Sequence, residues 1–292
     1  MSLEELLSAA AVGGIAGALA TLVSTVLKDL IFPRYLEEWK TKRELSRVFR
    51  KYKDPILLSS TEILYRIDEL FLTELDYLVR NHPVLPRDAR ETPTYTAPFY
   101  RQYKFESTVY RFCALLGWLE LYRIGGRFLN AETEPLVSGL DDKIDRIQAV
   151  LADRKLNAAP NWQEWNDRVI FREEQRAIAQ MMLTIAPDKE VSVLGYKEFC
   201  DRVVPSRPEW LQIVEDFLTG IQGTLKKDSR IIRLRALCIH LIDVIDVLRR
   251  LAPDSPLFER RREHVDALRR HVRDDANVAL FLYTSHDLQP TQ

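Results

Sequence analysis

Near its N-terminus the chain has a run of 22 residues without a charge, "LLSAAAVGGIAGALATLVSTVL", from Leu6 to Leu27. The chain as a whole is strongly charged, since 29% of its residues are Asp, Glu, Lys or Arg. A helix rises about 1.5 Å per residue, so the run would cover roughly 33 Å and could cross a hydrocarbon core of about 30 Å. We therefore expect residues 1–30 to form a transmembrane anchor, with residues 6–27 in the lipid bilayer.

Two other structures compete for this run. A cleaved signal peptide needs positive residues before the apolar stretch, but Glu4 and Glu5 stand there, and no convincing cleavage site follows. A buried hairpin helix of a soluble protein is the second alternative, because many Ala, Gly, Ser and Thr residues lower the hydrophobicity of the run. Uncharged runs of this length are uncommon in soluble cores, so the sequence favours a span.

The flanking charges indicate how the span is oriented. Residues 28–53 contain nine Lys or Arg and four Asp or Glu. Positive flanks stay in the cytoplasm, so we expect a single-pass protein of the cell inner membrane with a cytoplasmic C-terminal domain. Residues 31–53 form a basic juxtamembrane helix in this interpretation. Its Tyr35 and Trp39 either join an interfacial aromatic belt or lie on a solvated amphipathic helix.

Small residues inside the span suggest self-association. Gly13 and Gly17 form a GxxxG motif, which lets two helix backbones approach closely. The motif is weak by itself because Gly is frequent in spans. It leaves a homo-oligomer as an open possibility.

Composition limits the possible partners and the cellular compartment. The hydrophobic content of 46% predicts a packed core, and the net charge of −1 argues against nucleic acid as a partner of the whole molecule. Cys113, Cys200 and Cys238 are far apart in the sequence and odd in number. We expect buried free thiols in a reducing compartment, which agrees with a cytoplasmic domain.

The spacing of apolar residues predicts an all-α protein. Apolar residues recur at intervals of three and four, and glycine is scarce. Residues 54–275 are expected to form one all-α cytosolic multi-helix bundle, and residues 276–292 a tail. The individual helices are expected at residues 54–83, 99–129, 141–153, 161–187, 195–203, 207–225, 228–251 and 255–275. The first would begin with Asp54 as its cap and Pro55 at the first helical position. Its predicted apolar stripe consists of Ile56, Ile63, Ile67, Leu70, Leu75 and Leu78.

No sequence signature of a known chemistry is present, so the sequence leaves open whether the protein is an enzyme and favours a protein that is not. The five histidines are too scattered for a local metal site, and no cofactor is expected. Two polar clusters stand on apolar helices. They contain Arg172, Glu173 and Arg176 in the first helix, and His240, Asp243 and Asp246 in the second.

These clusters have two possible roles. They are either buried salt bridges between helices, for example between Asp243 and Arg176, or the lining of a ligand or catalytic pocket. The helix expected at residues 99–129 is unusually apolar and aromatic and is expected to be central. Its Glu106, Arg111, Glu120 and Arg123 are further candidate partners. The C-terminal segment 249–275 is rich in arginine and could bind anionic lipid or nucleic acid, but the acids interleaved with its arginines favour an ion-paired solvated helix.

Several segments together resemble a widespread, uncharacterised bacterial family of membrane-anchored all-α proteins. They are "KYKDPILLSS", "FESTVYRFCALLGWLELYRIGGRFL", "FREEQRAIAQMM" followed by "GYKEF", and "RLRALCIHLIDVIDVL". The resemblance covers most of residues 51–248 and implies an N-terminal anchor and a helical domain. It implies no activity, because none is known for that family.

Two hypotheses of function follow from the sequence. The first is a membrane-tethered cytosolic interaction or sensing module, which acts by binding an unknown protein partner or by self-association. The second is an enzyme or small-ligand binder with a polar pocket between helices, formed by Glu173, Arg176, His240 and Asp243.

Overall fold

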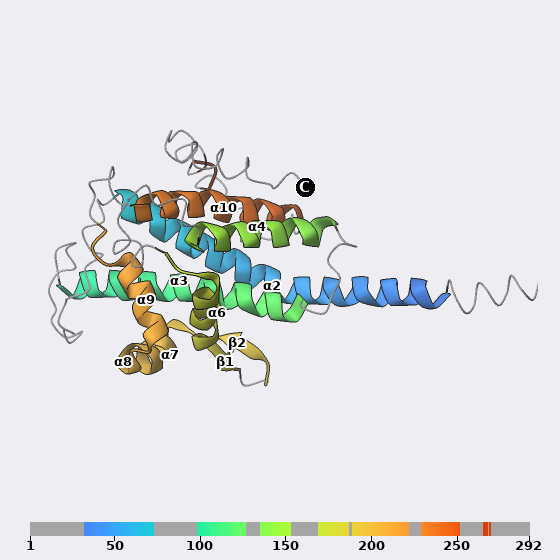
Figure 1. The fold of residues 1–292 in the computed structure, drawn as a ribbon, viewed down its shortest axis with the longest axis horizontal. Helices are drawn as coiled ribbons and strands as arrows, with labels where there is room; N and C mark the ends of the chain where they lie inside the picture. The colour runs from blue at the N-terminus through green and yellow to red at the C-terminus, as the bar shows by residue number, and fades with distance from the viewer. Residues whose placement is uncertain are drawn as a thin grey trace, which may run out of the picture.

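The computed structural model describes residues 32–72, 98–126, 135–152, 169–186, 189–221, 229–251, 265–267 and 269. Most of these residues are helical, which confirms the predicted helical class. The long helices are α2 (Phe32–Leu72), α3 (Pro98–Gly126), α4 (Pro135–Ala152) and α10 (Ser229–Leu251). Helix α2 packs against α3 and α10, and α10 also packs against α4 (Figure 1).

Shorter elements cover one side of α3 (Figure 1). They are α6 (Arg172–Met181), β1 (Leu183–Ile185), β2 (Val191–Val193), α7 (Tyr196–Glu198), the π-helical turn η4 (Phe199–Val203), α8 (Val204–Ser206) and α9 (Glu209–Leu218). Because α2, α6, β2 and α9 all contact α3, this helix occupies the centre of the body. The sequence predicted that position from its apolar and aromatic composition.

The core lies where α2, α3, α4 and α10 meet. The predicted apolar stripe of α2 is buried at Ile56, Ile63, Ile67 and Leu70. Leu75 and Leu78, which were expected to continue the stripe, lie outside the described residues. Phe112 of α3 is also buried and contacts the ring of Phe217 from α9. The helix-period pattern therefore identified the inward face of α2 correctly.

The predicted helix start at Asp54 is wrong, because α2 begins at Phe32 and continues through Pro55. Pro55 has no amide hydrogen, and a proline inside a helix costs about 3 kcal/mol. Tyr52, Ile56 and Leu57 on either side of it are buried in the core. Their burial offsets this cost, since each buried apolar side chain contributes about 1.5–3 kcal/mol.

The predicted helix 161–187 is wrong on both sides of α6, because residues 169–171 are not helical and strands follow Met182. Helix α6 ends at Met181, and β1 and β2 form an antiparallel hairpin in which Leu183 pairs with Val193 and Ile185 with Val191. β-Branched residues favour strands, which explains the change of structure. Gly117 of α3 lets the hairpin approach closely, because a Cβ at this position would lie 3.1 Å from a methyl group of Val193.

In the part of the chain that the structure describes, no helix is both long and apolar enough to cross a bilayer. Residues 6–27, with Gly13 and Gly17, lie outside that part, so both the membrane span and its self-association stay predictions. Of the predicted C-terminal helix 255–275, only residues 265–267 and 269 are described, and they are helical.

Candidate functional site

The first predicted cluster lies on the surface of α6. Both terminal nitrogens of Arg172 contact the carboxylate of Asp145 in α4, and the longer of these hydrogen bonds measures 3.1 Å. Arg176 Nη1 lies 3.7 Å from Glu173 Oε1 within the same helix, and the Glu173 side chain is 82% exposed. The cluster therefore joins α6 to α4 through Arg172, while Glu173 faces solvent.

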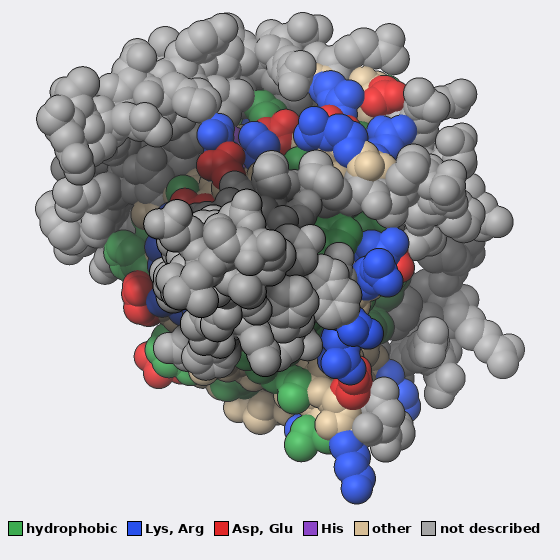
Figure 2. All heavy atoms as spheres, turned by 90° about the vertical axis from the view of Figure 1, so that its right-hand side faces the viewer, with side chains coloured by type: hydrophobic (Ala, Val, Ile, Leu, Met, Phe, Trp, Pro, Cys, Tyr) green, Lys and Arg blue, Asp and Glu red, His purple; other side chains and the backbone are tan. Residues whose placement is uncertain are grey.

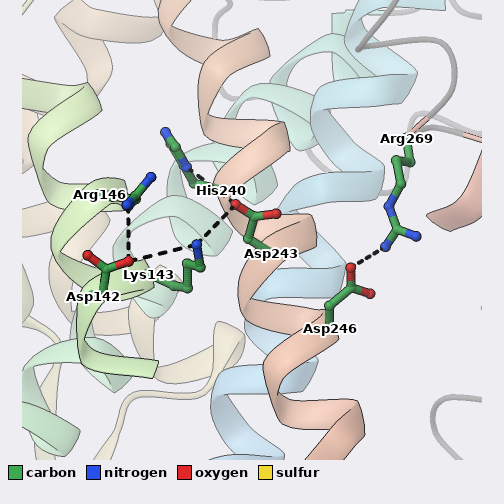
Figure 3. A network of polar contacts seen from close by, with 7 residues as sticks. All are labelled: Asp142, Lys143, Arg146, His240, Asp243, Asp246 and Arg269. Carbon is green, nitrogen blue, oxygen red and sulfur yellow. Dashed lines mark hydrogen bonds and ion pairs between the residues drawn. The ribbon is translucent and has the colours of Figure 1, made fainter. Parts of the chain in front are cut away.

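The second predicted cluster lies on α10 and faces α4 (Figure 3). Asp243 Oδ2 lies 3.8 Å from Lys143 Nζ of α4 and 3.9 Å from His240 Nδ1. Lys143 is also 3.7 Å from Asp142, which accepts a hydrogen bond of 3.1 Å from Arg146 Nε. Three charged residues of α4 thus continue the row of polar side chains that starts at His240.

Asp246 belongs to a separate group on the same helix. Its carboxylate pairs with Arg269 (Figure 3). Its Oδ1 also lies 3.9 Å from Arg249 Nη1. Arg269 also contacts Asp266, at 3.3 Å. Asp246 therefore ties the C-terminal segment to α10 instead of joining His240 and Asp243. The predicted pattern of interleaved acids and arginines is present here as ion pairs.

The six predicted residues thus form three groups. The expected pair of Asp243 with Arg176 is replaced by Asp243 with Lys143, because α4 contacts both α6 and α10 and supplies charged partners to each. The sequence could not assign this role to α4, since its charged residues look like an ordinary solvated helix face.

His240 has the features of a site residue more than the others do. Its side chain is buried, and its Nδ1 has no hydrogen-bond partner within the described part of the chain. The nearest carboxylate oxygen, of Asp243, is beyond hydrogen-bond distance at 3.9 Å. A buried nitrogen without a partner normally costs free energy, so this position is a candidate contact for a bound molecule or water.

A buried charge cluster between α2 and α3 was missed by the sequence analysis. Arg66 Nη2 donates a hydrogen bond of 3.1 Å to Ser107, and Arg66 Nη1 lies 3.3 Å from Glu69. Lys104 of α3 pairs with the same carboxylate and lies over the ring of Tyr100. The available signal was the position of Arg66 inside the apolar stripe of α2, directly before Ile67.

Two arginines of α10 bind the C-terminal ends of other helices. Arg230 donates to the carbonyls of Thr219 and Gly220 at the end of α9, at 2.7 and 3.3 Å. Arg233 is completely buried and donates to the carbonyl of Val150 near the end of α4, at 2.6 Å. These carbonyls have no partner within their own helices, so the arginines satisfy them.

Burial changes the acidity of several groups. Burial raises the pKa of the Asp141 carboxyl, and an interaction with Tyr122 partly opposes this shift. Burial also raises the pKa of the Cys113 and Cys238 thiols. Both thiols are free, and so is the half-buried Cys200. All three cysteines are free as predicted, but the predicted burial is confirmed only for Cys113 and Cys238, which lie in the core as unreactive neutral thiols.

Comparisons with protein families, with curated proteins and with solved structures find no significant match to this chain. Among the described residues, no group of three or more His, Cys, Asp and Glu side chains is placed to hold a metal ion. The inference of function therefore depends on the helices and on the polar contacts between them.

Proposed function

We propose that this protein is a membrane-tethered helical interaction module, in which α2 connects an anchor in residues 6–27 to a cytosolic body. The observation that carries the proposal is the length and continuity of α2. Its 41 residues correspond to roughly 60 Å, and the N-terminal part extends beyond the bundle (Figure 1).

The contacts of α2 support a rigid connection. Val48 and Tyr52 pack against Gly125 of α3, and the core side chains from Ile56 to Leu70 follow within the same helix. A continuous helix transmits a rotation or a shift from one end to the other, whereas a flexible linker does not. A signal that moves the anchor would therefore reach the core directly.

The polar contacts inside the body support a module more than an active site. Arg230 and Arg233 satisfy helix ends, and Glu69 neutralises buried cations. Gln175 donates to the carbonyls of Gln148 and Ile170, at 2.9 and 2.8 Å, and so joins α6 to the end of α4. Each of these side chains has a structural partner, as expected where polar groups hold helices together.

The first prediction concerns the anchor. The full-length protein should stay in the membrane pellet after alkaline carbonate washing, whereas a chain that starts at Lys28 should be released, because only the former keeps the uncharged run. Equal release of both chains would contradict the span. Protease added to inside-out vesicles should digest the C-terminal domain, and protection there would contradict the proposed orientation.

A second candidate function is a small-ligand site at His240. The observation that favours it is the buried Nδ1 without a hydrogen-bond partner, with the Asp243 carboxylate and Lys143 ammonium close by. An imidazole beside a carboxylate and an ammonium could bind a polar ligand or transfer a proton. This candidate ranks second because it depends on one unpaired atom.

The two candidates predict opposite effects for Asp243→Ala. If Asp243 is a structural partner of Lys143, thermal unfolding should show a loss of about 0.5–1 kcal/mol, since both side chains are about one quarter exposed. The double variant Asp243→Leu with Lys143→Met should recover part of this loss, because no unpaired charge remains. Asp142→Ala, at a more exposed carboxylate, is the matched control. A melting temperature at or above that of the wild type would instead support a ligand site, whose residues are often held at a cost to stability.

A further inference from the structure

The large apolar side chains that the described part of the chain leaves most exposed lie at one end of the body. Ile185 and Val191, 74% and 46% exposed, are opposite each other in the hairpin of β1 and β2. Ile124, 42% exposed, is next to Gly125, which packs against Val48 of α2. Exposed apolar groups that gather in one place commonly mark a contact surface.

The same end is where α2 leaves the body. The hairpin touches α2 there, since Lys51 Nζ lies 2.9 Å from Glu190. Beyond this contact the N-terminal part of α2 extends away from the other helices (Figure 1). The exposed apolar side chains are therefore close to the segment that leads to residues 6–27.

Cations line α2 at this end. Arg43, Arg47 and Arg50 are exposed, and their spacing of four and three residues places them on one helix face. Like charges at this spacing repel one another slightly within a helix, and together they make this face of α2 strongly basic. Lys189 adds an exposed cation in the hairpin turn, where its φ is 65°. Figure 2 looks onto this end, and Lys and Arg side chains gather at several places on it.

We infer that this end of the body docks on anionic lipid headgroups, with the arginines of α2 against the phosphates and Ile185 and Val191 in the bilayer interface. The inference rests on the proposed function, because an anchor in residues 6–27 keeps the chain at a bilayer. The hairpin contacts α2 at Lys51, roughly 28 Å along the helix from Phe32, so docking requires α2 to lie along the membrane surface. Cations and apolar side chains at a membrane surface strengthen binding together. Docking would orient the body and present α7, α8 and α9 to the cytosol.

Both features of the surface fit a bilayer. Anionic lipid attracts arginines, and the region below the headgroups buries Ile185 and Val191. A nucleic acid would also attract the arginines through its phosphates, but it offers no apolar region to the hairpin. Lipid therefore accounts for the apolar and the basic side chains together.

The test uses the full chain in lipid nanodiscs of phosphatidylcholine alone or mixed with phosphatidylglycerol. Amide hydrogen exchange of residues 183–193 should be on the order of tenfold slower in the anionic discs at low salt, because docking holds the hairpin closed. The difference should disappear at high salt, which screens exposed charges. The salt comparison uses the wild-type chain, so it is independent of how any variant folds.

Substitutions then test whether the slower exchange in anionic discs depends on the arginines of α2 and on the hairpin. Arg47→Gln with Arg50→Gln should remove most of the protection, since each cation near an anionic surface contributes about a fivefold preference. Ile185→Thr should weaken it while keeping a β-branched residue in the strand. The matched control is Lys197→Gln with Arg202→Gln, two exposed cations on α7 and η4, outside both α2 and the hairpin.

The outcomes separate this inference from the proposed function. Equal exchange in the two kinds of disc, with the chain inserted, overturns the docking and leaves the anchor intact. A chain that fails to insert contradicts the anchor, and cosedimentation with vesicles of the same two lipids then decides the docking by itself. Binding of RNA or DNA through Arg47 and Arg50, without any preference for anionic vesicles, would also overturn it.

Discussion

Replacing Glu69 by alanine should lower the free energy of unfolding by about 2–4 kcal/mol. The change removes the carboxylate that lies against Arg66 and Lys104, both of which are buried between α2 and α3. Loss of one partner of a buried ion pair typically costs about 3–5 kcal/mol, and we expect somewhat less because the Glu69 side chain is one third exposed. Thermal or denaturant unfolding of the full chain in detergent measures the loss.

Two further variants test the cause. Glu69→Gln keeps the size of the side chain and its hydrogen-bonding capacity but removes the charge, so its cost should be intermediate. Glu173→Ala removes a carboxylate that is almost fully exposed and should change stability by less than about 0.5 kcal/mol. If Glu69→Ala is as mild as Glu173→Ala, the cluster around Arg66 does not contribute to stability as proposed here.

Replacing Arg233 by alanine should cost about 3–5 kcal/mol. Arg233 is completely buried, so its removal leaves a cavity, and the Val150 carbonyl at the end of α4 loses a donor at 2.6 Å. Arg233→Met should recover the part of this cost that comes from the cavity, because methionine fills most of the volume. The same unfolding measurement applies.

Arg235→Ala, two residues further along α10, is the matched control. Arg235 stacks on the ring of Phe71, with its guanidinium 5.2 Å from the ring centroid, and it is only partly buried. Loss of such a contact should cost about 0.5–1 kcal/mol. Similar losses for Arg233→Ala and Arg235→Ala would show that capping of α4 is not important for the fold.

Some contacts of the candidate site could be predicted from the sequence, and others could not. The sequence predicted that His240 and Asp243 lie near each other, because residues three apart on a helix are neighbours, and their atoms are 3.9 Å apart. It could not predict that Lys143 is a partner of Asp243, since the two residues belong to helices far apart in the sequence. Glu173 looked like a member of the same site but faces solvent.

The same division applies to the secondary structure. Helices α3, α9 and α10 were predicted because apolar spacing and cap residues are local signals. Two features were not predicted: the continuation of α2 through Pro55 and the hairpin after Met182. At the proline, local preference is outweighed by the burial of Tyr52 and Ile56. At the hairpin, the β-branched residues of β1 and β2 favour strands over the helix that the apolar spacing predicted.

The sequence by itself determined the helical class, the inward face of α2 and the three free cysteines, because helix periodicity and residue hydrophobicity are properties of neighbouring residues. Only the tertiary structure decided which charges meet. Lys104 and Arg233 carry charge yet are buried, because each finds its partner on a different helix, the Glu69 carboxylate of α2 and the Val150 carbonyl of α4. Arg66 is buried too, and it adds the Ser107 hydroxyl of α3 to Glu69 of its own helix. Such partners depend on how the helices pack in space, and the spacing of these residues in the sequence does not predict that packing.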